Sequence, residues 1–136
     1  MTPLGPSLRN LNRFVNRDGA NINQISYLQS VGVLNDFQLS QVPHIVDYND
    51  LNTSLTERGR AYLAMNCAHC HNPNAWEAST EREFDFRYET PLDQTGIQYE
   101  EDKIIDALLD QEMPFIGTTI VDREGVDLIV EFMESL

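Results

Sequence analysis

The chain has 136 residues, of which 41% are hydrophobic and 23% charged, a balance that excludes a disordered or fibrous protein and suits one folded domain. Its formal net charge is -13, and from Glu100 onward eleven acids accompany only two bases, which argues against nucleic acid as a partner because phosphates would be repelled. No apolar run is long enough to span a membrane, and the acidity serves either solubility alone or docking to a basic patch on a partner protein.

The amino-acid usage changes near Asn52, and we divide the chain there. Residues 1–52 are rich in asparagine and nearly balanced in charge, and we expect them to form an N-terminal extension packed on the core. Residues 53–136 carry the strong helix signals and are expected to form that core. Because no segment alternates apolar and polar residues convincingly, the predicted fold class is all-α.

One short helix is predicted in the extension. Apolar residues recur at helical spacing from Ile22 to Val31, and Gly32 supplies a stop signal. The preceding N-R-D-G-A-N is expected to be a turn. An EF-hand loop with its glycine at Gly19 would need acids or amides where Phe14 and Ile25 stand.

Three helices are predicted in the core. Ser54, with a glutamate three residues later, is a capping-box signature that opens a helix from about Leu55 to Cys67. Acids at 100–102 favour the start of a second helix, which must stop before Pro114, and a third helix opens near Asp122. The residues expected to face the core are Leu55, Gly59, Tyr62 and Leu63, then Ile104, Ile105, Leu108 and Leu109, and finally Val126, Ile129, Val130 and Met133, with Leu128 and Phe132 beside them.

The stretch A-M-N-C-A-H-C-H-N-P contains both cysteines of the chain in a C-x-x-C-H pattern. This pattern is the attachment signature of c-type haem. On one helical turn, Cys67 and Cys70 can each add to a haem vinyl group as a thioether, which holds His71 under the iron as its proximal ligand. The motif therefore predicts one covalently bound haem c.

Two other uses of the cysteines are weighed against haem. A zinc site would need four ligands, which Cys67, Cys70, His71 and the distant His44 could supply, although the usual second ligand pair is missing. A thioredoxin-like disulfide site would expect a strand before the first cysteine, whereas a capped helix is predicted here.

The sixth ligand of the iron is predicted to be Met113, which stands in a loop between two predicted helices and is followed by a proline. Met65 and His69 belong to the attachment segment and cannot cross to the opposite haem face. Met133 has the helical spacing of a core methionine. His44 remains the rival ligand.

With these residues the chain resembles class I cytochromes c over about residues 55–136: a helix, C-A-H-C-H, a methionine-proline loop and a final helix. In that family a glycine eight residues before the first cysteine lets the first and last helices cross closely, and Gly59 occupies that position. Leu63 stands where an aromatic residue is usual, with Tyr62 adjacent. The family also often has a proline about a dozen residues after the proximal histidine, whose carbonyl orients it; Pro73 is too near and Pro91 rather far.

A narrower resemblance covers nearly the whole chain. The stretches N-Q-I-S-Y-L, N-C-A-H-C-H-N-P, F-D-F-R-Y-E-T-P-L, E-M-P-F-I-G-T and D-R-E-G-V-D-L-I look like monohaem cytochrome c domains at the C-terminal end of larger secreted bacterial proteins. This likeness implies a periplasmic or extracellular location and an export signal upstream of residue 1. It also implies an electron relay on a longer chain, joined to an oxidoreductase module or a carbohydrate-related module.

The predicted function is single-electron transfer, because two protein ligands that close both axial positions suit electron transfer better than substrate chemistry. The chain is therefore expected not to be an enzyme. The alternative is a peroxidase-like enzyme or a gas-binding sensor with an open or exchangeable sixth position. Donors considered for the haem propionates are Arg60, Trp76, Arg87, Tyr88 and Tyr99.

Overall fold

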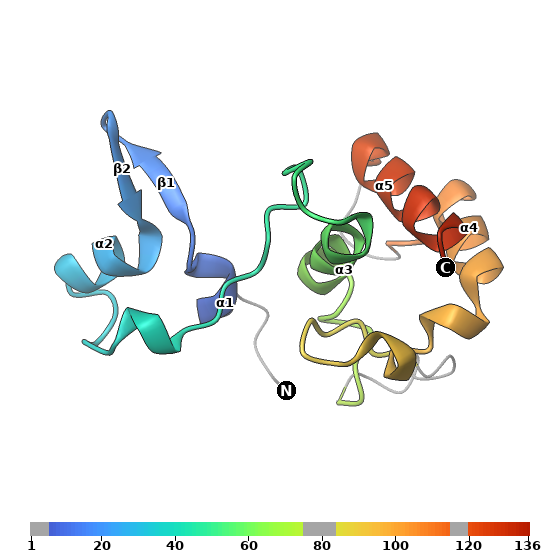
Figure 1. Cartoon of the computed structure of the whole chain (residues 1–136), viewed down its shortest axis with the longest axis horizontal. Helices are drawn as coiled ribbons and strands as arrows, with labels where there is room; N and C mark the ends of the chain where they lie inside the picture. Colours follow the sequence, from blue (N-terminus) through green and yellow to red (C-terminus); the bar gives the residue numbers. More distant parts are fainter. Residues whose placement is uncertain (1–5, 75–83, 115–119) are drawn as a thin grey trace. The chain divides into compact units, whose positions relative to one another are not determined.

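The computed structural model describes residues 6–74, 84–114 and 120–136. The chain divides into two compact units, Met1–Ile45 and Val46–Leu136 (Figure 1). This boundary lies a few residues before the one drawn from the sequence at Asn52. The two units are described separately.

The first unit combines short helices with one β-hairpin. The predicted short helix is confirmed as α2, although Ile22 belongs to a strand and the helix begins after it. Val31 caps its C-terminus, and Gly32 follows with a positive φ, as the stop signal predicted. The elements are α1 (Leu8–Leu11), β1 (Phe14–Arg17), β2 (Ala20–Asn23), α2 (Gln24–Ser30) and the 3-10 helix η1 (Leu39–Gln41).

The hairpin departs from the all-helical expectation. Strands β1 and β2 pair antiparallel, with Val15 opposite Ile22, around the predicted turn at Asp18 and Gly19. Both turn residues have a positive φ, of 52° and 84°, as a two-residue hairpin turn requires. Each strand has only four residues and exposes most of them, so no apolar alternation marks them in the sequence.

Asparagine side chains tie the elements of this unit together. The Asn23 side chain accepts hydrogen bonds from the backbone N–H groups of Ile25 and Ser26 and so caps α2. Its amide nitrogen donates to Oδ1 of Asn12 at 2.9 Å, and Asn12 in turn donates to the carbonyl of Val42 at 2.7 Å. Ile25, which is fully buried, and Asn23 form the small interior of the unit.

The second unit contains the three predicted core helices, all of which are confirmed. Ser54 caps the first of them by accepting from the backbone N–H of Glu57 at 3.2 Å. The second helix ends before Pro114, and Asp122 caps the third. The elements are α3 (Leu55–Asn66), the 3-10 helices η3 (Leu92–Gln94) and η4 (Ile97–Tyr99), α4 (Glu101–Leu109) and α5 (Arg123–Glu134).

The core of this unit lies between α3, α4, α5 and the segment 84–100. Met133 is buried in it, which confirms its prediction as a core methionine. One residue of the predicted faces is wrong: Leu109 is 58% exposed at the end of α4. On α5, Val126 and Val130 are half-buried at the edge of a face that centres on Leu128 and Phe132. The buried cluster consists of Leu63, Ala68, Phe84, Phe86, Ile97, Ile104, Ile129, Phe132 and Met133.

The predicted close crossing of α3 and α5 is confirmed at Gly59. A Cβ atom built on Gly59 would lie 2.6 Å from Cγ and 2.9 Å from Cβ of Phe132, closer than atoms can pack. A second glycine, Gly125, has the same role on α5. A Cβ atom built on Gly125 would overlap the ring of Tyr62 on α3. The Tyr62 hydroxyl donates to Asp122 at 2.9 Å, so the two helices run antiparallel with their backbones in close approach.

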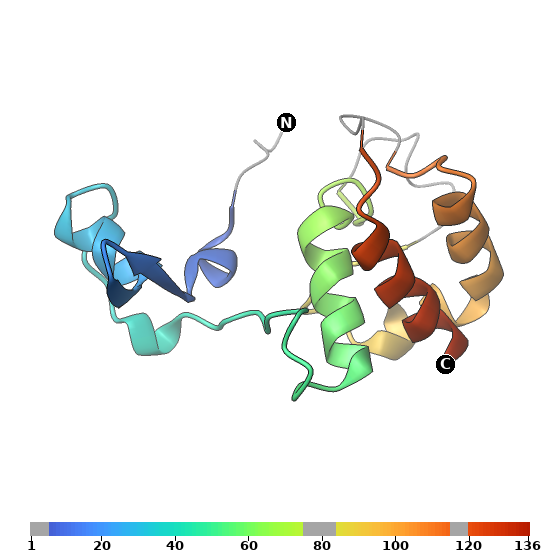
Figure 2. The ribbon, with the colours of Figure 1, turned by 90° about the horizontal axis from the view of Figure 1, so that it is seen from above.

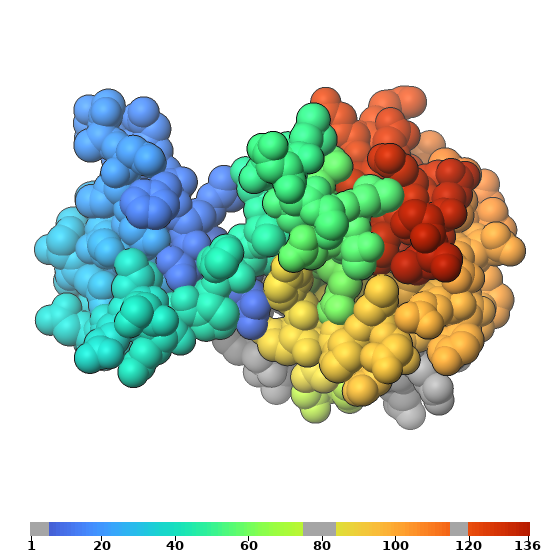
Figure 3. All heavy atoms as spheres, viewed as in Figure 1, coloured from blue at the N-terminus to red at the C-terminus, as the bar shows by residue number. Residues whose placement is uncertain are grey.

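Figure 2 shows that α3 and α4 end, and α5 begins, at the same end of the second unit. The C-x-x-C-H motif directly follows α3 and Met113 follows α4, so both lie at this end. In Figure 3, the segment 84–100 (yellow) packs against α3 (green) and α4 (orange) within the same body.

Candidate haem site

The cysteine motif forms a single turn that continues from α3. Cys67 is the C-cap of the helix, and its N–H donates to the carbonyl of Leu63 at 2.9 Å. The Cys67 carbonyl then accepts from the N–H of Cys70 at 3.0 Å and of His71 at 2.9 Å. The bond between His71 and Cys67 closes one helical turn, which brings both cysteines and the histidine onto one short stretch of backbone.

The two thiols are free and differ in their surroundings. Cys70 is exposed, whereas Cys67 is partly covered by the core. Burial raises the pKa of the Cys67 thiol to about 12, and the neighbouring Cys70 adds a smaller effect in the same direction. A thiol of such high pKa stays protonated at neutral pH, which is the opposite of the lowered pKa that activates a thioredoxin-like cysteine.

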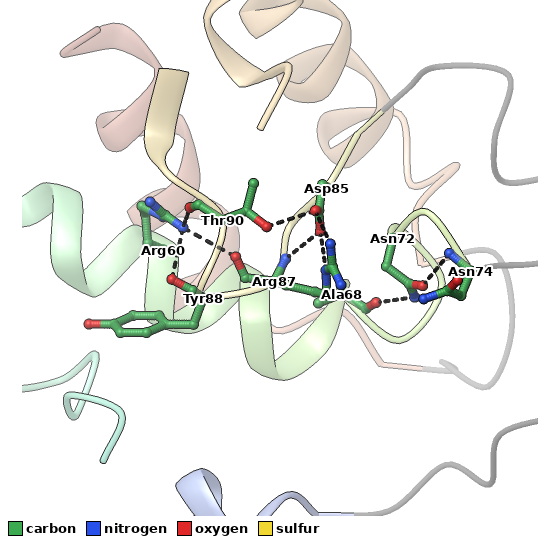
Figure 4. A network of polar contacts seen from close by, with 8 residues as sticks. All are labelled: Arg60, Ala68, Asn72, Asn74, Asp85, Arg87, Tyr88 and Thr90. Atoms are coloured by element: carbon green, nitrogen blue, oxygen red, sulfur yellow. Dashed lines mark hydrogen bonds and ion pairs between the residues drawn. The ribbon is translucent and has the colours of Figure 1, made fainter. Parts of the chain in front are cut away.

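The side chain of Asn72 stabilises the turn that contains the motif. Its amide nitrogen donates to the carbonyl of Ala68 at 2.7 Å and to that of His69 at 3.3 Å (Figure 4). Its Oδ1 accepts from the backbone N–H of Asn74 at 2.9 Å. These bonds pair carbonyls of the turn that follows α3.

His71 packs against two phenylalanine rings. The centroid of its imidazole lies 5.1 Å from that of Phe86 and 6.1 Å from that of Phe84, and the Nδ1 atom is buried. The two phenylalanine rings stack on each other with centroids 5.1 Å apart. The backbone N–H of Phe86 also donates to the carbonyl of His71 at 3.0 Å, so the segment beginning at residue 84 contacts the histidine through both backbone and rings.

Asp85, which stands between these two phenylalanines in the sequence, is at the centre of a polar network (Figure 4). Arg87 donates to the Asp85 carboxylate from Nε at 2.8 Å and from Nη2 at 2.6 Å, and the Thr90 hydroxyl donates at 2.7 Å. Hydrogen bonding from Arg87 is the main cause that lowers the pKa of Asp85 to about 2. The Asp85 side chain is only 11% exposed, so these donors replace the lost hydration of its carboxylate.

Arg60 connects the same segment to α3. Its Nη2 donates to the carbonyls of Arg87 at 3.2 Å, of Tyr88 at 3.1 Å and of Thr90 (Figure 4). Arg60 and Arg87 were both considered as propionate donors, but in this structure they donate to groups of the protein itself. Of the other donors considered, Tyr99 is 78% exposed, and Trp76 lies outside the described residues.

Met113 lies in the loop after α4, as the sequence predicted. Its N–H donates to the carbonyl of Ala107 at 3.0 Å, which folds the loop back onto the last turn of the helix. The residue is 40% exposed. Three of the four predicted site residues therefore share one turn, and the fourth stands on a separate loop at the same end of the unit.

Of the other ligands considered, Met65 is within α3 and His69 is an exposed residue of the motif turn, whereas His44 belongs to the first unit. Across residues 6–74, 84–114 and 120–136, no three His, Cys, Asp or Glu side chains gather closely enough to hold a metal ion.

The residues that are present fit covalent haem attachment. The two cysteines are free thiols on one helical turn, as addition to two vinyl groups requires, and the histidine is the next residue on that turn. The helix α3 that enters the motif is also confirmed, whereas a thioredoxin-like site would expect a strand there.

Sequence reasoning missed the polar network around the motif. Asp85, Asn72 and Gly125 all lie within the stretches of the narrower resemblance, but no pattern in the sequence assigned a contact to any of them. Arg60 was singled out, but for a different role. A search for helix-facing glycines in the last helix would have found Gly125, because two crossing helices both need a small residue.

Comparison of the chain with protein-family models, curated proteins and solved structures found no match. In the part of the chain that the structure describes, no helix has the length and apolar character needed to cross a membrane.

Proposed function

We propose that this chain is a monohaem c-type cytochrome domain that transfers single electrons. The observation that carries the proposal is the turn from Cys67 to His71, which follows a capped helix and presents two free thiols with a histidine directly behind them. The wider class I likeness is supported by the close crossing of α3 and α5 at Gly59.

In this proposal each residue has a defined role. The Cys67 and Cys70 thiols would each add across a haem vinyl group, so that a sulfur–carbon bond forms and the thiol proton goes to the neighbouring carbon. His71 would hold the iron through a ring nitrogen, and Met113 would hold it through its thioether sulfur. The group would supply a one-electron couple, whose potential a methionine ligand raises.

The surroundings of the motif suit electron transfer. Phe84 and Phe86 are buried beside His71 and exclude water from one side of the imidazole. Burial of a redox centre in apolar surroundings reduces the reorganisation of solvent that accompanies a change of charge. Two protein ligands that would close both axial positions suit electron transfer better than substrate chemistry, so we propose a relay rather than an enzyme.

We further propose that the domain works outside the cytosol and passes electrons to or from a partner protein or a fused oxidoreductase module with a basic patch. The acidic residues of α4 and α5 support this, since Asp102, Asp106, Asp127 and Glu131 are all exposed. Complementary charge speeds the encounter of redox partners, and such an effect weakens as salt is added.

A spectroscopic experiment tests the proposal. The chain is exported in a host that attaches c-type haem, and the reduced-minus-oxidised absorption spectrum is recorded for wild type and for Met113→Ala. We expect a six-coordinate spectrum in wild type, with slow carbon monoxide binding. Met113→Ala should lower the reduction potential, bind carbon monoxide readily and show more peroxidase activity.

Met65→Ala is the matched control, because it removes a methionine from α3 and should leave all three properties unchanged. Rapid carbon monoxide binding by wild type, with a spectrum that Met113→Ala does not alter, would contradict closure by Met113. The position would then be open or held by His44, and a peroxidase-like enzyme or gas sensor would replace the relay.

A further inference from the structure

The segment from Phe84 to Thr90 is held in place from two directions, although it has no regular secondary structure. Asp85 closes it internally, because its carboxylate accepts from the Arg87 guanidinium and the Thr90 hydroxyl. Arg60 holds it from outside by donating to three of its carbonyls from α3. We call these two sets of bonds the Arg60–Asp85 brace.

The part of the segment that the brace fixes is the part that contacts His71. Asp85 lies between Phe84 and Phe86 in the sequence, and its own N–H donates to the carbonyl of Thr95 at 3.1 Å. With Asp85 anchored, the two rings can stack at an interplanar angle of 20° and contact the imidazole. The N–H of Phe86 holds the backbone of the histidine as well.

The charged side chains of the brace form hydrogen bonds to other groups of the protein. Asp85 is buried and its side chain is 11% exposed, while the side chain of Arg87 is 46% exposed. The guanidinium of Arg60 lies 5.9 Å from the ring centroid of Tyr88, over the same loop. A buried carboxylate with four donors and a guanidinium bound to three carbonyls are costly to disturb, so the brace is rigid compared with an ordinary loop.

We propose that Arg60 and Asp85 are positioning residues for His71. Through the phenylalanine pair they fix the rotation of the imidazole plane about its own axis, and through that rotation they tune the electronic properties of any metal bound to His71. This inference rests on the proposed function only for the effect on iron. The ordering of the imidazole by the brace holds with or without a cofactor.

The test compares variants of the full exported chain by NMR, in the reduced, diamagnetic state where the protein carries haem. Arg60→Met and Asp85→Ala should weaken the nuclear Overhauser contacts between the rings of Phe86 and His71. They should also broaden or double the His71 ring resonances. In haem-loaded protein brought to the oxidised, paramagnetic state, the same two variants should shift the electron paramagnetic resonance g-values, and they should also shift the reduction potential.

Two matched controls separate positioning from general stability. Arg58→Met also removes a guanidinium from α3 that donates to a carbonyl, that of Tyr48 at 2.7 Å, but it does not touch the brace. Asp93→Ala removes an exposed carboxylate from the same stretch of chain. Both should leave the ring contacts and the His71 resonances as in wild type.

If Arg60→Met or Asp85→Ala fails to fold, more conservative variants still decide the test. Asp85→Asn keeps an acceptor oxygen and Arg60→Lys keeps a donor, so both should give intermediate effects. Wild-type ring contacts in the Arg60 and Asp85 variants, or equal loss in Arg58→Met, would overturn the proposal. Absence of haem from the exported protein would contradict the proposed function, while the ring contacts would still decide the role of the brace.

Discussion

Replacing Gly59 with alanine tests the crossing of α3 and α5 most simply. The new Cβ would lie 2.6 Å from Cγ and 2.9 Å from Cβ of Phe132, which is fully buried. Alanine favours a helix interior over glycine by about 1 kcal/mol, so helix propensity alone predicts a gain in stability. The clash opposes this gain.

The clash should prevail. Overpacking of a buried contact costs about 1 to 3 kcal/mol, and this site belongs at the upper end because the overlap involves atoms close to the backbone of Phe132. The expected net loss is about 1 to 2 kcal/mol. For a unit of this size that loss corresponds to a fall in melting temperature of roughly 5 to 15 °C.

The assay is thermal unfolding of Gly59→Ala, Phe132→Ala and the double variant, followed by circular dichroism. Phe132→Ala alone loses packing, but it removes Cγ and the ring, which the new methyl group would strike, and leaves only Cβ. The two changes should therefore be less costly together than the sum of the single effects, by about 1 kcal/mol. A stabilised Gly59→Ala, or strictly additive effects, would refute the close crossing.

Three further predictions follow from the site. In the chain without haem, iodoacetamide at a pH of about 8 should label exposed Cys70 before Cys67, because burial raises the pKa of Cys67 to about 12; peptide mass mapping gives the order, and equal rates would contradict the burial. Acidification from about pH 4 to pH 2 should remove about 1 to 2 kcal/mol of stability through Asp85, since its folded pKa of about 2 lies below its unfolded value and the stabilisation is lost as the carboxylate is protonated. Urea unfolding across that range should give a shallower dependence for Asp85→Asn, and an unchanged slope would assign the effect to other groups. Gly125→Ala should destabilise α5 by overlap with Tyr62, and adding Tyr62→Leu should recover part of the loss in the same unfolding assay; no recovery would place the strain elsewhere.

The helices of the second unit could be predicted because their signals are local. The Ser54 cap, the acids before α4 and the proline after Met113 act within a few residues of the chain, and the structure confirms the boundaries that they imply. The hairpin of the first unit could not be predicted from apolar alternation, since its strands are short and exposed. The Asp18-Gly19 pair was its one usable signal.

The candidate site divides in the same way. The motif from Cys67 to His71 is encoded in five consecutive residues, so the sequence alone identifies it. The surroundings depend on pairs such as Arg60 with the carbonyl of Tyr88, or Tyr62 with Asp122, which are separated by tens of residues. A single sequence does not reveal which of its arginines and aspartates meet in space.

Covalent attachment of haem to Cys67 and Cys70 is the central claim, and the intact mass of the denatured protein tests it most directly. The chain is exported in a host with a haem-attachment system, unfolded in acid and denaturant, and weighed. We predict the mass of the polypeptide plus one haem, and the mass of the polypeptide alone for Cys67→Ser/Cys70→Ser. A wild-type mass equal to the bare polypeptide would contradict the account.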